Sequence, residues 1–446
     1  MANSIETWLI LAHGFNMDGR AASHTITDKI PHLRAAGKEL IVISSPTGYP
    51  DRELEHYQVY PIGPVGLRFD LRHVLRRYWG KDWRYQLATS LITLGLAPGI
   101  ILEKWLWPLE SQWSWWWPAY RRGRKLIRQR RIDLIYSTGG AYSAHFAAAA
   151  LKRTTGLSWI AEIHDPLVIP GQDPRNRQER MRAQIESLIC TNADLAFWFT
   201  DQACASAQRR HPLLGNRGQV IIPGADAPQW ELPRYQKRPN LIIAHFGSLS
   251  PTRHLAGIIQ VLARLGERIP ESVGKIELHI YGTDLDRNTR IAMTQYVDVA
   301  VRYWGRIEQN ESTAKTGRQQ ILEQMRQADI LLLHHGVEPA CAEYIPSKLY
   351  EYLWMQRPVL GLIHRNPQLE QILREFGHVV VPADNLELQI AVMADFYQRW
   401  RRNGLPDNGR TSPYTSAAAV ARLLKLISES HLPRPIHGVG TKEISD

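Results

Sequence analysis

Two carboxylates in the segment E-Y-I-P-S-K-L-Y-E have types and spacing that suit a binding site: Glu343 and Glu351, with seven residues between them. Pro346 suits the first turn of a helix, which the apolar spacing after it continues. The unpaired N–H groups at such a helix start form an anion site suited to a diphosphate. Glu343 can then accept hydrogen bonds from sugar hydroxyls, and Glu351 from a ribose. The pattern indicates a nucleotide-sugar site; the alternative is an ordinary amphipathic helix before a buried strand.

This segment resembles the donor site of the retaining glycosyltransferases of family 4, the group 1 transferases. That family has a Glu-x7-Glu pair before a helix and a G-x-P-V strand, and M-Q-R-P-V at 355–359 stands at that place here. The resemblance implies a GT-B fold, in which two doubly wound Rossmann-like α/β domains face a cleft. It implies transfer of a sugar from a nucleotide-diphosphate sugar, with retention of configuration. At the helix start it implies donor contacts from Ser347, Lys348, Leu349 and Glu351.

A glycine loop opens the second half of the chain with H-F-G-S-L-S-P-T-R-H-L, in which Gly247 ends a predicted strand. The resembled family has two basic residues five apart in this loop, and they hold the donor diphosphate. This chain has Ser248 at the first of those places and Arg253 at the second, so Lys348 is the candidate for the missing cation. An arginine on a diphosphate neutralises charge on the leaving group. The alternative is a loop arginine that only caps a helix or forms a salt bridge.

Three polar side chains follow a predicted strand in W-I-A-E-I-H-D-P-L: Glu162, His164 and Asp165. The resembled family often has R-D-P or H-D-P at this place, near the sugar and the acceptor. The resemblance implies that His164 hydrogen-bonds the donor sugar and that Asp165 orients the acceptor or the loop. The donor phosphate accepts the proton in such an enzyme, so no protein nucleophile is expected. The residues expected to carry the chemistry are His164, Arg253, Lys348 and Glu343.

Two glycine turns follow strands in the first half. Gly14, in L-A-H-G-F-N-M-D-G-R, lets the backbone approach a donor closely, although the family's usual glycine pair is replaced here by Gly14 and the more distant Gly19. The turn S-T-G-G-A-Y-S-A-H contains Gly140 and His145, which we expect on the acceptor side. Neither turn is the G-x-G-x-x-G of nicotinamide enzymes or a Walker loop of ATP-binding proteins.

No cofactor and no essential metal are expected. Asp284 and Asp286 form a D-x-D pattern that binds metal in another transferase fold, but a solvated turn is the preferred interpretation. The three cysteines, Cys190, Cys204 and Cys341, lack the spacing of metal ligands and indicate a reducing compartment. The first residues have no basic region before their apolar run, so we expect no signal peptide and a cytoplasmic location.

Short apolar runs alternate with helical stretches along the chain, as is typical of parallel sheets in α/β proteins. The first half has predicted strands at 8–12, 40–44, 133–137, 159–163, 195–199 and 219–223. The second half has them at 241–246, 276–281, 299–304, 330–334, 359–363 and 379–381. Two such series predict two doubly wound domains whose ligands bind outside the carboxyl ends of the strands.

The proline-rich joint near 223–240 divides the chain into an N-terminal acceptor-binding domain at 1–226 and a C-terminal nucleotide-sugar-binding domain at 227–411. A helix at 412–430 is expected to cross back to the first domain, as in the resembled family. The tail at 431–446 is expected to be flexible.

An insertion at 61–131 combines tryptophan with arginine. The chain has a formal net charge of +11, and 121–131 holds seven basic residues and no acidic one. Indole rings beside cations favour the interface of an anionic membrane. The expected membrane-docking residues are Trp115, Trp116, Trp117, Arg121, Arg122 and Arg124. The alternatives are an arginine-rich helix packed on its own tryptophans and nucleic-acid binding, for which no motif is present.

The uncharged stretch at 85–102 approaches the length of a membrane span, but Pro98-Gly99 is expected to break it, so we predict no transmembrane helix. The expected partners are a nucleotide sugar, a glycan or lipid-linked acceptor and the inner membrane surface, where the protein would be peripheral; no nucleic acid is expected. Two alternatives stay open: a nucleotide-sugar epimerase of the same architecture, which needs no acceptor, and a non-catalytic basic protein that binds membrane or nucleic acid.

Overall fold

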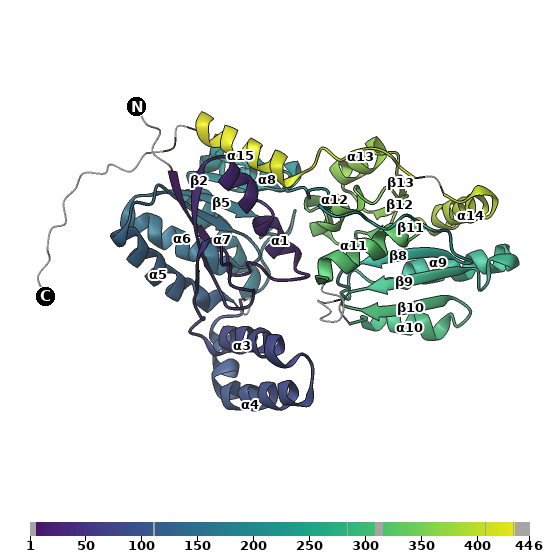
Figure 1. Ribbon diagram of the computed structural model, residues 1–446, viewed down its shortest axis with the longest axis horizontal. Helices are drawn as coiled ribbons and strands as arrows, with labels where there is room; N and C mark the ends of the chain where they lie inside the picture. The colour runs from purple at the N-terminus through teal and green to yellow at the C-terminus, as the bar shows by residue number, and fades with distance from the viewer. Residues whose placement is uncertain are drawn as a thin grey trace, which may run out of the picture.

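Two fully parallel sheets form the two halves of the molecule, which lie side by side in the computed structural model (Figure 1). The model describes residues 6–109, 112–282, 284–307, 315–405, 407–430 and 432, so nearly all of the predicted tail at 431–446 lies outside the described residues. The first sheet has the strand order β3-β2-β1-β4-β5-β6-β7 and the second the order β10-β9-β8-β11-β12-β13. The predicted α/β class with two doubly wound units is confirmed.

The strands of the first sheet are β1 (Glu6–Leu11), β2 (Lys38–Ser44), β3 (Glu55–Gln58), β4 (Leu134–Thr138), β5 (Ser158–Ile163), β6 (Leu195–Trp198) and β7 (Gly218–Val220). Those of the second are β8 (Leu241–Phe246), β9 (Ile276–Tyr281), β10 (Ala300–Gly305), β11 (Ile330–His334), β12 (Val359–Ile363) and β13 (Val379–Pro382). All twelve predicted strands are present. Among the described residues, the one strand that the pattern missed is β3, whose sequence E-H-Y-Q is polar and lies at a sheet edge.

Helices cover both faces of each sheet and bury its apolar side chains, as parallel sheets require. The first half has α1 (Ala21–Thr27), α2 (Ile30–Ala35), α3 (Pro64–Trp79), α4 (Trp83–Leu106), α5 (Trp116–Gln129), α6 (Tyr142–Thr155), α7 (Arg177–Asn192) and α8 (Asp201–Arg210). The second half has α9 (Ala256–Arg268), α10 (Arg287–Gln295), α11 (Gly317–Gln327), α12 (Lys348–Tyr352), α13 (Pro367–Glu375), α14 (Leu386–Asn403) and α15 (Ser416–Glu429). Short 3-10 turns include η1 (Trp113–Trp115) and η4 (Pro339–Glu343).

The last helix, α15, packs on the first sheet although it follows the second one in the chain (Figure 1). Its buried side chains share a core with α1, α2 and the strands of the first sheet, on the face opposite to α5–α8. Asp226 holds the start of α15, because one carboxylate oxygen accepts from the N–H of Ser416 at 2.9 Å and the other lies 2.6 Å from His32. The segment that leads into α15 is therefore anchored to the first half at a capped helix end.

Helices α3 and α4 form an antiparallel hairpin that extends away from the first sheet (Figure 1). Glu103, which is buried, holds its base: the carboxylate accepts from the N–H of Val65 at 2.9 Å and from Nε1 of Trp113 at 2.7 Å. Near the middle of the hairpin, Arg68 donates to Thr93 at 2.7 Å. These bonds fix the hairpin at its base and join its two helices.

Helix α4 continues through Pro98, so the predicted break at Pro98-Gly99 is wrong. A proline inside a helix removes one backbone hydrogen bond and costs about 3 kcal/mol. Packing against α3 offsets this cost, because Gly99 admits α3 so closely that a Cβ there would lie 2.7 Å from Cγ of Pro64. Within the described residues, α4 is the one helix long and apolar enough to cross a membrane by length and composition, and 0% of its apolar window is buried.

The substitution Glu103→Ala should lower the free energy of unfolding by about 1–3 kcal/mol, because the N–H of Val65 and Nε1 of Trp113 lose their acceptor at a buried position. Urea denaturation followed by circular dichroism measures the change. Glu53→Ala is the matched control, since that side chain is 84% exposed and should change stability by less than about 0.5 kcal/mol. Equal effects of the two substitutions would show that Glu103 does not support the hairpin.

Candidate functional site

The two halves meet at the carboxyl ends of their strands, where ligands of such sheets bind. Asp18, in the loop after β1, accepts the N–H of Gly317 at 2.9 Å with its carboxylate and Arg306 at 2.8 Å with its carbonyl. On the other side of the cleft, the Thr200 hydroxyl after β6 donates to the carbonyl of Glu343 at 2.6 Å. Loops that follow β1 and β6 thus contact the second half at these two points.

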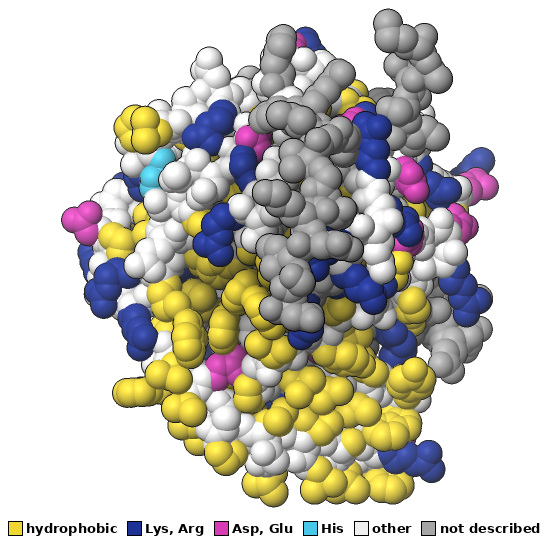
Figure 2. Space-filling view, turned by 90° about the vertical axis from the view of Figure 1, so that its left-hand side faces the viewer, with side chains coloured by type: hydrophobic (Ala, Val, Ile, Leu, Met, Phe, Trp, Pro, Cys, Tyr) yellow, Lys and Arg dark blue, Asp and Glu magenta, His cyan; other side chains and the backbone are white. Residues whose placement is uncertain are grey.

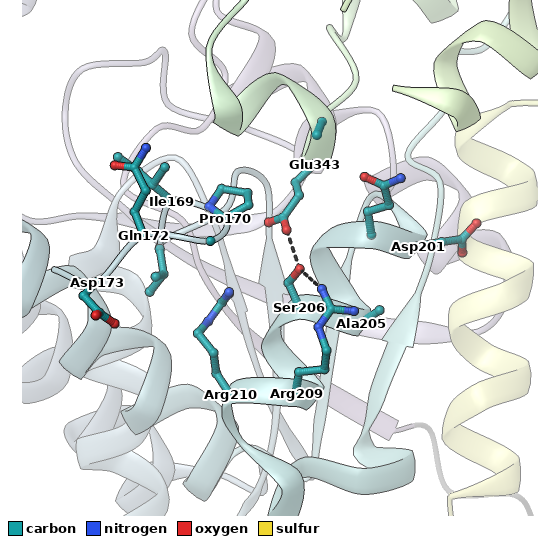
Figure 3. Close-up of a pocket in the computed structure, with 14 residues that line it drawn as sticks. Ile169, Pro170, Gln172, Asp173, Asp201, Ala205, Ser206, Arg209, Arg210 and Glu343 are labelled. Atoms are coloured by element: carbon teal, nitrogen blue, oxygen red, sulfur yellow. Dashed lines mark hydrogen bonds between the residues drawn. The ribbon is translucent and has the colours of Figure 1, made fainter. Parts of the chain in front are cut away.

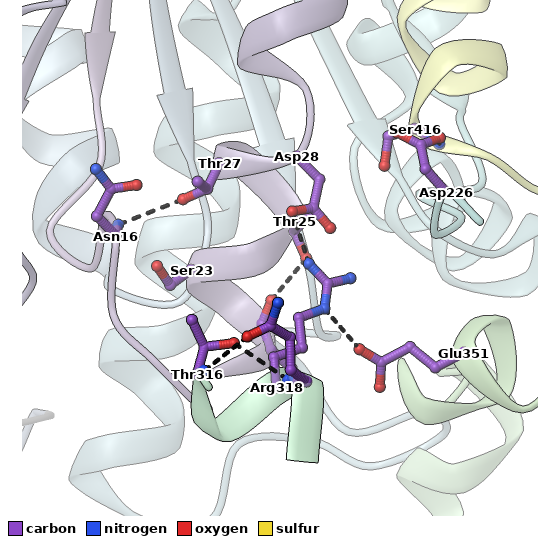
Figure 4. Close-up of polar contacts among 12 residues, drawn as sticks. Asn16, Ser23, Thr25, Thr27, Asp28, Asp226, Thr316, Arg318, Glu351 and Ser416 are labelled. Atoms are coloured by element: carbon purple, nitrogen blue, oxygen red, sulfur yellow. Dashed lines mark hydrogen bonds and ion pairs between the residues drawn. The ribbon is translucent and has the colours of Figure 1, made fainter. Parts of the chain in front are cut away.

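Arg318, near the start of α11, joins the halves through carboxylates from both (Figure 4). Its guanidinium lies 2.8 Å from Asp28, which follows α1, and 3.2 Å from Glu351 in α12, whose other oxygen lies 2.7 Å from Lys348. Burial raises the pKa of Glu351, but Lys348 and Arg318 outweigh it and lower the pKa to about 2. Glu351 is therefore ionised. It lies close enough to α1 that its negative charge raises the pKa of His24, although burial and Arg318 lower that pKa more.

The predicted donor contacts at the start of α12 divide between the surface and the core. Ser347 is exposed and Lys348 is half-buried. Leu349 is a correction: its side chain is completely buried among the strands and helices of the second half, and its N–H donates to the carbonyl of Pro346 at 3.0 Å. Because neither its side chain nor its N–H is available, Leu349 supports the helix and does not contact a ligand.

Arg253 connects the loop after β8 with the segment after η4. Its Nε and Nη2 donate to the carbonyl of Ser248 at 3.1 and 2.8 Å, and Nη1 lies 3.4 Å from the hydroxyl of Tyr344. The loop needs glycine, since Gly247 has a φ of +152° and a Cβ on Gly282 would lie 1.9 Å from the Gly247 carbonyl. The half-buried guanidinium thus stands over a tightly packed glycine loop, where an anion can meet it.

Three histidines outside the predicted site residues lie near Arg253: His245, His334 and His335. Burial is the main cause that lowers their pKa values, to about 4, 3 and 4, and Arg253 lowers them further. They are therefore neutral at physiological pH. Their positions at the ends of β8 and β11 were the sequence signal that could have indicated a place in the site.

Among the described residues, no group of three or more His, Cys, Asp or Glu side chains could hold a metal ion.

Glu162 lies at the centre of a buried polar cluster in the first half. Its carboxylate lies 2.6 Å from Nζ of Lys29 and 2.8 Å from Nε2 of His164, and it accepts hydrogen bonds from the hydroxyls of Tyr136 and Thr138. Burial raises the pKa of Glu162, but Lys29 and His164 outweigh it and lower the pKa to about 2. Glu162 is therefore ionised, and it is paired with Lys29 beneath the cleft.

His164 has one ring edge on this cluster and the other toward the cleft. Nε2 lies near Thr138 and Glu162, and the ring stacks on Phe199 with centroids 4.9 Å apart. The turn after β4 covers the ring so closely that a Cβ on Gly139 would lie 2.9 Å from it. Gly140, with a φ of +90°, packs against α1 in the same turn. Because Nε2 faces the cluster, Nδ1 is the atom that can meet a ligand.

Of the other residues predicted for the site in the first half, Gly14 and Asp165 lie in loops after strands, whereas His145 lies in the core. Gly14 lies in the loop after β1, where a Cβ would be 3.2 Å from Sδ of Met17, and Asp165 is exposed beside His164. His145 is a correction: it is buried inside α6 and its Nδ1 lies 2.9 Å from the hydroxyl of Ser137. Burial lowers the pKa of His145 to about 3. It is a neutral core residue, because the helix turns it toward the sheet, and it cannot line the acceptor side.

Glu343 lines a cavity of about 800 Å³ enclosed by the loop at 168–173, α8 and η4 (Figure 3). Its Oε1 accepts from the hydroxyl of Ser206, which in turn accepts from Arg209 at 2.6 Å. Burial raises the pKa of Glu343. Its second oxygen, Oε2, is buried and has no hydrogen-bond partner among the described residues. A carboxylate oxygen of this kind can accept a hydroxyl from a ligand.

The tryptophan and arginine segment needs one correction, since Trp115 does not face a membrane. It is completely buried, meets the ring of His13 edge-on at 5.5 Å and donates from Nε1 to the carbonyl of Val59 at 3.0 Å. Trp116 is half-buried and Trp117 is exposed. The basic residues of α5 also differ from one another: Arg121 and Arg124 are exposed, whereas Arg122 stacks over the ring of Tyr57 at 3.8 Å.

Large apolar side chains are exposed on α4 instead. They follow one another at helical spacing along its length: Trp83, Leu87, Leu91, Leu94, Ile101, Leu102 and Trp105. Figure 2 shows hydrophobic side chains gathered at the bottom of the molecule, where the α3–α4 hairpin lies. The predicted docking residues did not include these side chains, because they have the composition of a buried helix; within the described part of the chain, the fold leaves them exposed.

The chain is similar in fold to several solved structures. No protein-family model and no curated protein matches it. Among solved structures it is similar to TarM of S. aureus, at 10% identity over 95% of this chain and 99% of that one, with a TM-score of 0.60. It is similar to WaaG, a glycosyltransferase involved in lipopolysaccharide biosynthesis, at 13% identity over 93% of both chains, with a TM-score of 0.53.

A putative UDP-N-acetylglucosamine 2-epimerase from Listeria monocytogenes is also similar, at 10% identity over 98% of this chain and 100% of that one, with a TM-score of 0.54. These likenesses extend over nearly the whole chain and include both sheets. At such low identity they establish the architecture: two Rossmann-like α/β units that face a cleft, which is the GT-B fold.

The substitution Glu162→Gln should lower the free energy of unfolding by about 3–5 kcal/mol, because it leaves the charge of Lys29 buried without its partner. Urea denaturation measures the loss. The double variant Lys29→Met/Glu162→Gln should recover part of it, since the uncompensated charge is then absent. A double variant no more stable than Glu162→Gln would contradict the assignment of the loss to the unpaired lysine.

Proposed function

We propose that this protein is a glycosyltransferase that transfers a sugar from a nucleotide-diphosphate sugar, with retention, to a glycan or lipid-linked acceptor at the inner membrane surface. One observation carries the proposal. Arg253, Lys348 and Glu351 of the second half and His164 of the first lie on loops and helix starts at the carboxyl ends of two sheets that face each other. In this proposal the cations bind the diphosphate and His164 offers a hydrogen bond to the sugar.

In the proposed reaction, the bond between the anomeric carbon and the diphosphate oxygen breaks while the acceptor hydroxyl oxygen bonds to the same face of that carbon. The hydroxyl proton moves to the departing phosphate oxygen, so no protein nucleophile, cofactor or metal takes part. Arg253 and Lys348 stabilise the negative charge on the leaving diphosphate, and the glycine loop at Gly247 allows its close approach. Glu351 shares its charge with Arg318 and can accept a ribose hydroxyl at its remaining lone pairs.

His164 and Glu343 orient the sugar. Because Nε2 of His164 faces the ionised Glu162, the proton is favoured on Nε2 and the lone pair on Nδ1, where it accepts a sugar hydroxyl. Glu343 presents its buried oxygen Oε2 at the cavity wall for a second hydroxyl. Two such contacts restrict the rotation of the sugar before reaction, which is the main rate contribution of positioning groups.

The hairpin supports a membrane acceptor. A bilayer span by α4 would carry the packed α3 and its arginines into hydrocarbon, which is costly. Lying in the interface, α4 buries its apolar face and keeps α3 on the aqueous side. Arg121, Arg124 and the other basic residues of α5 favour an anionic surface. We therefore assign membrane docking to α4 and treat the arginine segment as its electrostatic support.

Two of the similar structures support this proposal. WaaG is a glycosyltransferase involved in lipopolysaccharide biosynthesis, and TarM has been solved with UDP and alpha-GlcNAc-glycerol. The similarity to a putative epimerase keeps that activity as the second candidate. An epimerase converts the donor alone and needs no membrane, so the exposed face of α4 favours the transferase. Product analysis with and without a membrane fraction separates the two activities.

Thermal stabilisation across a panel of UDP-, GDP-, ADP- and CDP-sugars tests the donor site. One nucleotide should raise the melting temperature, because a ligand at a hundred times its Kd adds about 2.7 kcal/mol to the free energy of unfolding. Glu351→Gln should abolish this increase, whereas Glu267→Ala, at an exposed position of the second half, should retain it. An increase that is the same in Glu351→Gln would remove Glu351 from the donor site.

Flotation with liposomes that contain anionic lipid tests the membrane contact. Leu94→Gln/Ile101→Gln should weaken binding at least tenfold, because each side chain, more than 70% exposed, loses about 1.5–3 kcal/mol of burial in the bilayer. The control Val273→Ser/Val297→Ser removes exposed apolar groups of the second half and should bind as the parent does. Neutralising Arg121 and Arg124 should reduce binding mainly at low salt. Unchanged binding in the α4 variant would end this assignment.

A further inference from the structure

A second large cavity, of about 850 Å³, lies where the turn of the α3–α4 hairpin meets the mouth of the cleft. Its walls come from four places in the chain: the loop after β1, the loop after β2, the hairpin turn and the end of β10. The first half supplies most of the wall, and the second half supplies Arg306. The cavity therefore spans both halves on the side of the cleft opposite to the cavity of Glu343.

The charge of this cavity is strongly positive. Its basic lining residues are Arg76, Arg77, Lys81, Arg84 and Arg306. Its acidic lining residues are Asp18 and Asp82. Asp82 caps the start of α4, because its Oδ1 accepts the N–H of Tyr85 at 2.9 Å. This carboxylate is therefore oriented toward the backbone of α4. The surplus of cations is what an anion with several oxygens requires.

The wall next to the hairpin is held in place by Arg77. Its Nη2 donates to the carbonyls of Pro46 at 3.1 Å and Gly48 at 2.6 Å. Its guanidinium also stacks over the ring of Tyr49 at 4.4 Å. These contacts attach the end of α3 to the loop after β2, and they keep one positive charge fixed at the inner wall.

The wall next to the cleft is held by Arg306, whose Nη2 donates to the carbonyl of Asp18 at 2.8 Å. His73 adds no positive charge, because burial lowers its pKa to about 4, and Arg20 and Arg306 lower it further. The positive potential of the cavity thus comes from permanent cations on two domains. A bound anion would bridge the hairpin, the loop after β1 and the second half.

We propose that this cavity binds the phosphate or diphosphate group of a lipid-linked acceptor, whose hydrocarbon chain remains in the bilayer beside α4. The exposed aromatic rings of Tyr78 and Trp79 line the cavity on the side of the hairpin turn, where the chain would leave it. A phosphate that links a lipid to a glycan is a diester with one negative charge, a linking diphosphate has two, and their free oxygens accept bonds from guanidinium groups. The inference rests on the proposed transfer to a membrane acceptor and names its anchoring group.

Binding of farnesyl phosphate, measured by titration calorimetry without nucleotide, tests the proposal. The parent should bind it at least tenfold more tightly than farnesol, which has the same chain and no charge. Lys81→Gln/Arg84→Gln removes two exposed cations of the cavity and should weaken farnesyl phosphate binding at least tenfold while leaving farnesol unchanged. The matched control Arg72→Gln/Lys104→Gln, at exposed hairpin positions outside this cavity, should stay within about twofold of the parent.

Three results would overturn the assignment. Equal effects of the two double variants would show general electrostatic attraction and no site. Loss of binding in Arg253→Gln, but not in Lys81→Gln/Arg84→Gln, would place the phosphate in the donor site. Inorganic phosphate that binds as tightly as farnesyl phosphate would assign the cavity to a free anion. Stabilisation by nucleotide sugars should be unchanged in Lys81→Gln/Arg84→Gln, so a failure of the donor proposal is detected separately.

Discussion

The buried ion pair between Lys29 and Glu162 holds the floor of the cleft together. Removing two charges from water is costly, and such a pair persists only where further hydrogen bonds satisfy the carboxylate. Tyr136, Thr138 and His164 supply those bonds. One carboxylate therefore fixes the corner between α1 and α2, the ends of two strands and the ring of the histidine that faces the cleft.

The same corner also determines how the two halves meet. Asp28 and Lys29 are consecutive, yet Lys29 reaches inward to Glu162 while Asp28 reaches across the cleft to Arg318. Arg318 in turn shares Glu351 with Lys348. The orientation of a candidate sugar-binding residue and the charge state of a candidate donor-binding residue thus depend on one helix corner, because both ion pairs begin there.

The hairpin extends this arrangement outward. Glu103 fixes its base, the apolar face of α4 runs along its length, and the basic cavity lies between its turn and the cleft mouth. These three features lie in order along the hairpin, and the proposed membrane acceptor rests on them.

The sequence by itself determined the parallel sheets and their twelve predicted strands, since continuous apolar runs bounded by turns specify buried strands locally. The resemblance of the segments around His164 and Arg253 to family motifs also indicated these two residues as candidates. Only the tertiary structure decided which side chains face a partner: it buried Trp115, Leu349 and His145 and left the apolar residues of α4 exposed. Ion pairs such as Lys29 with Glu162 join residues far apart in the chain, and local spacing carries no record of such contacts.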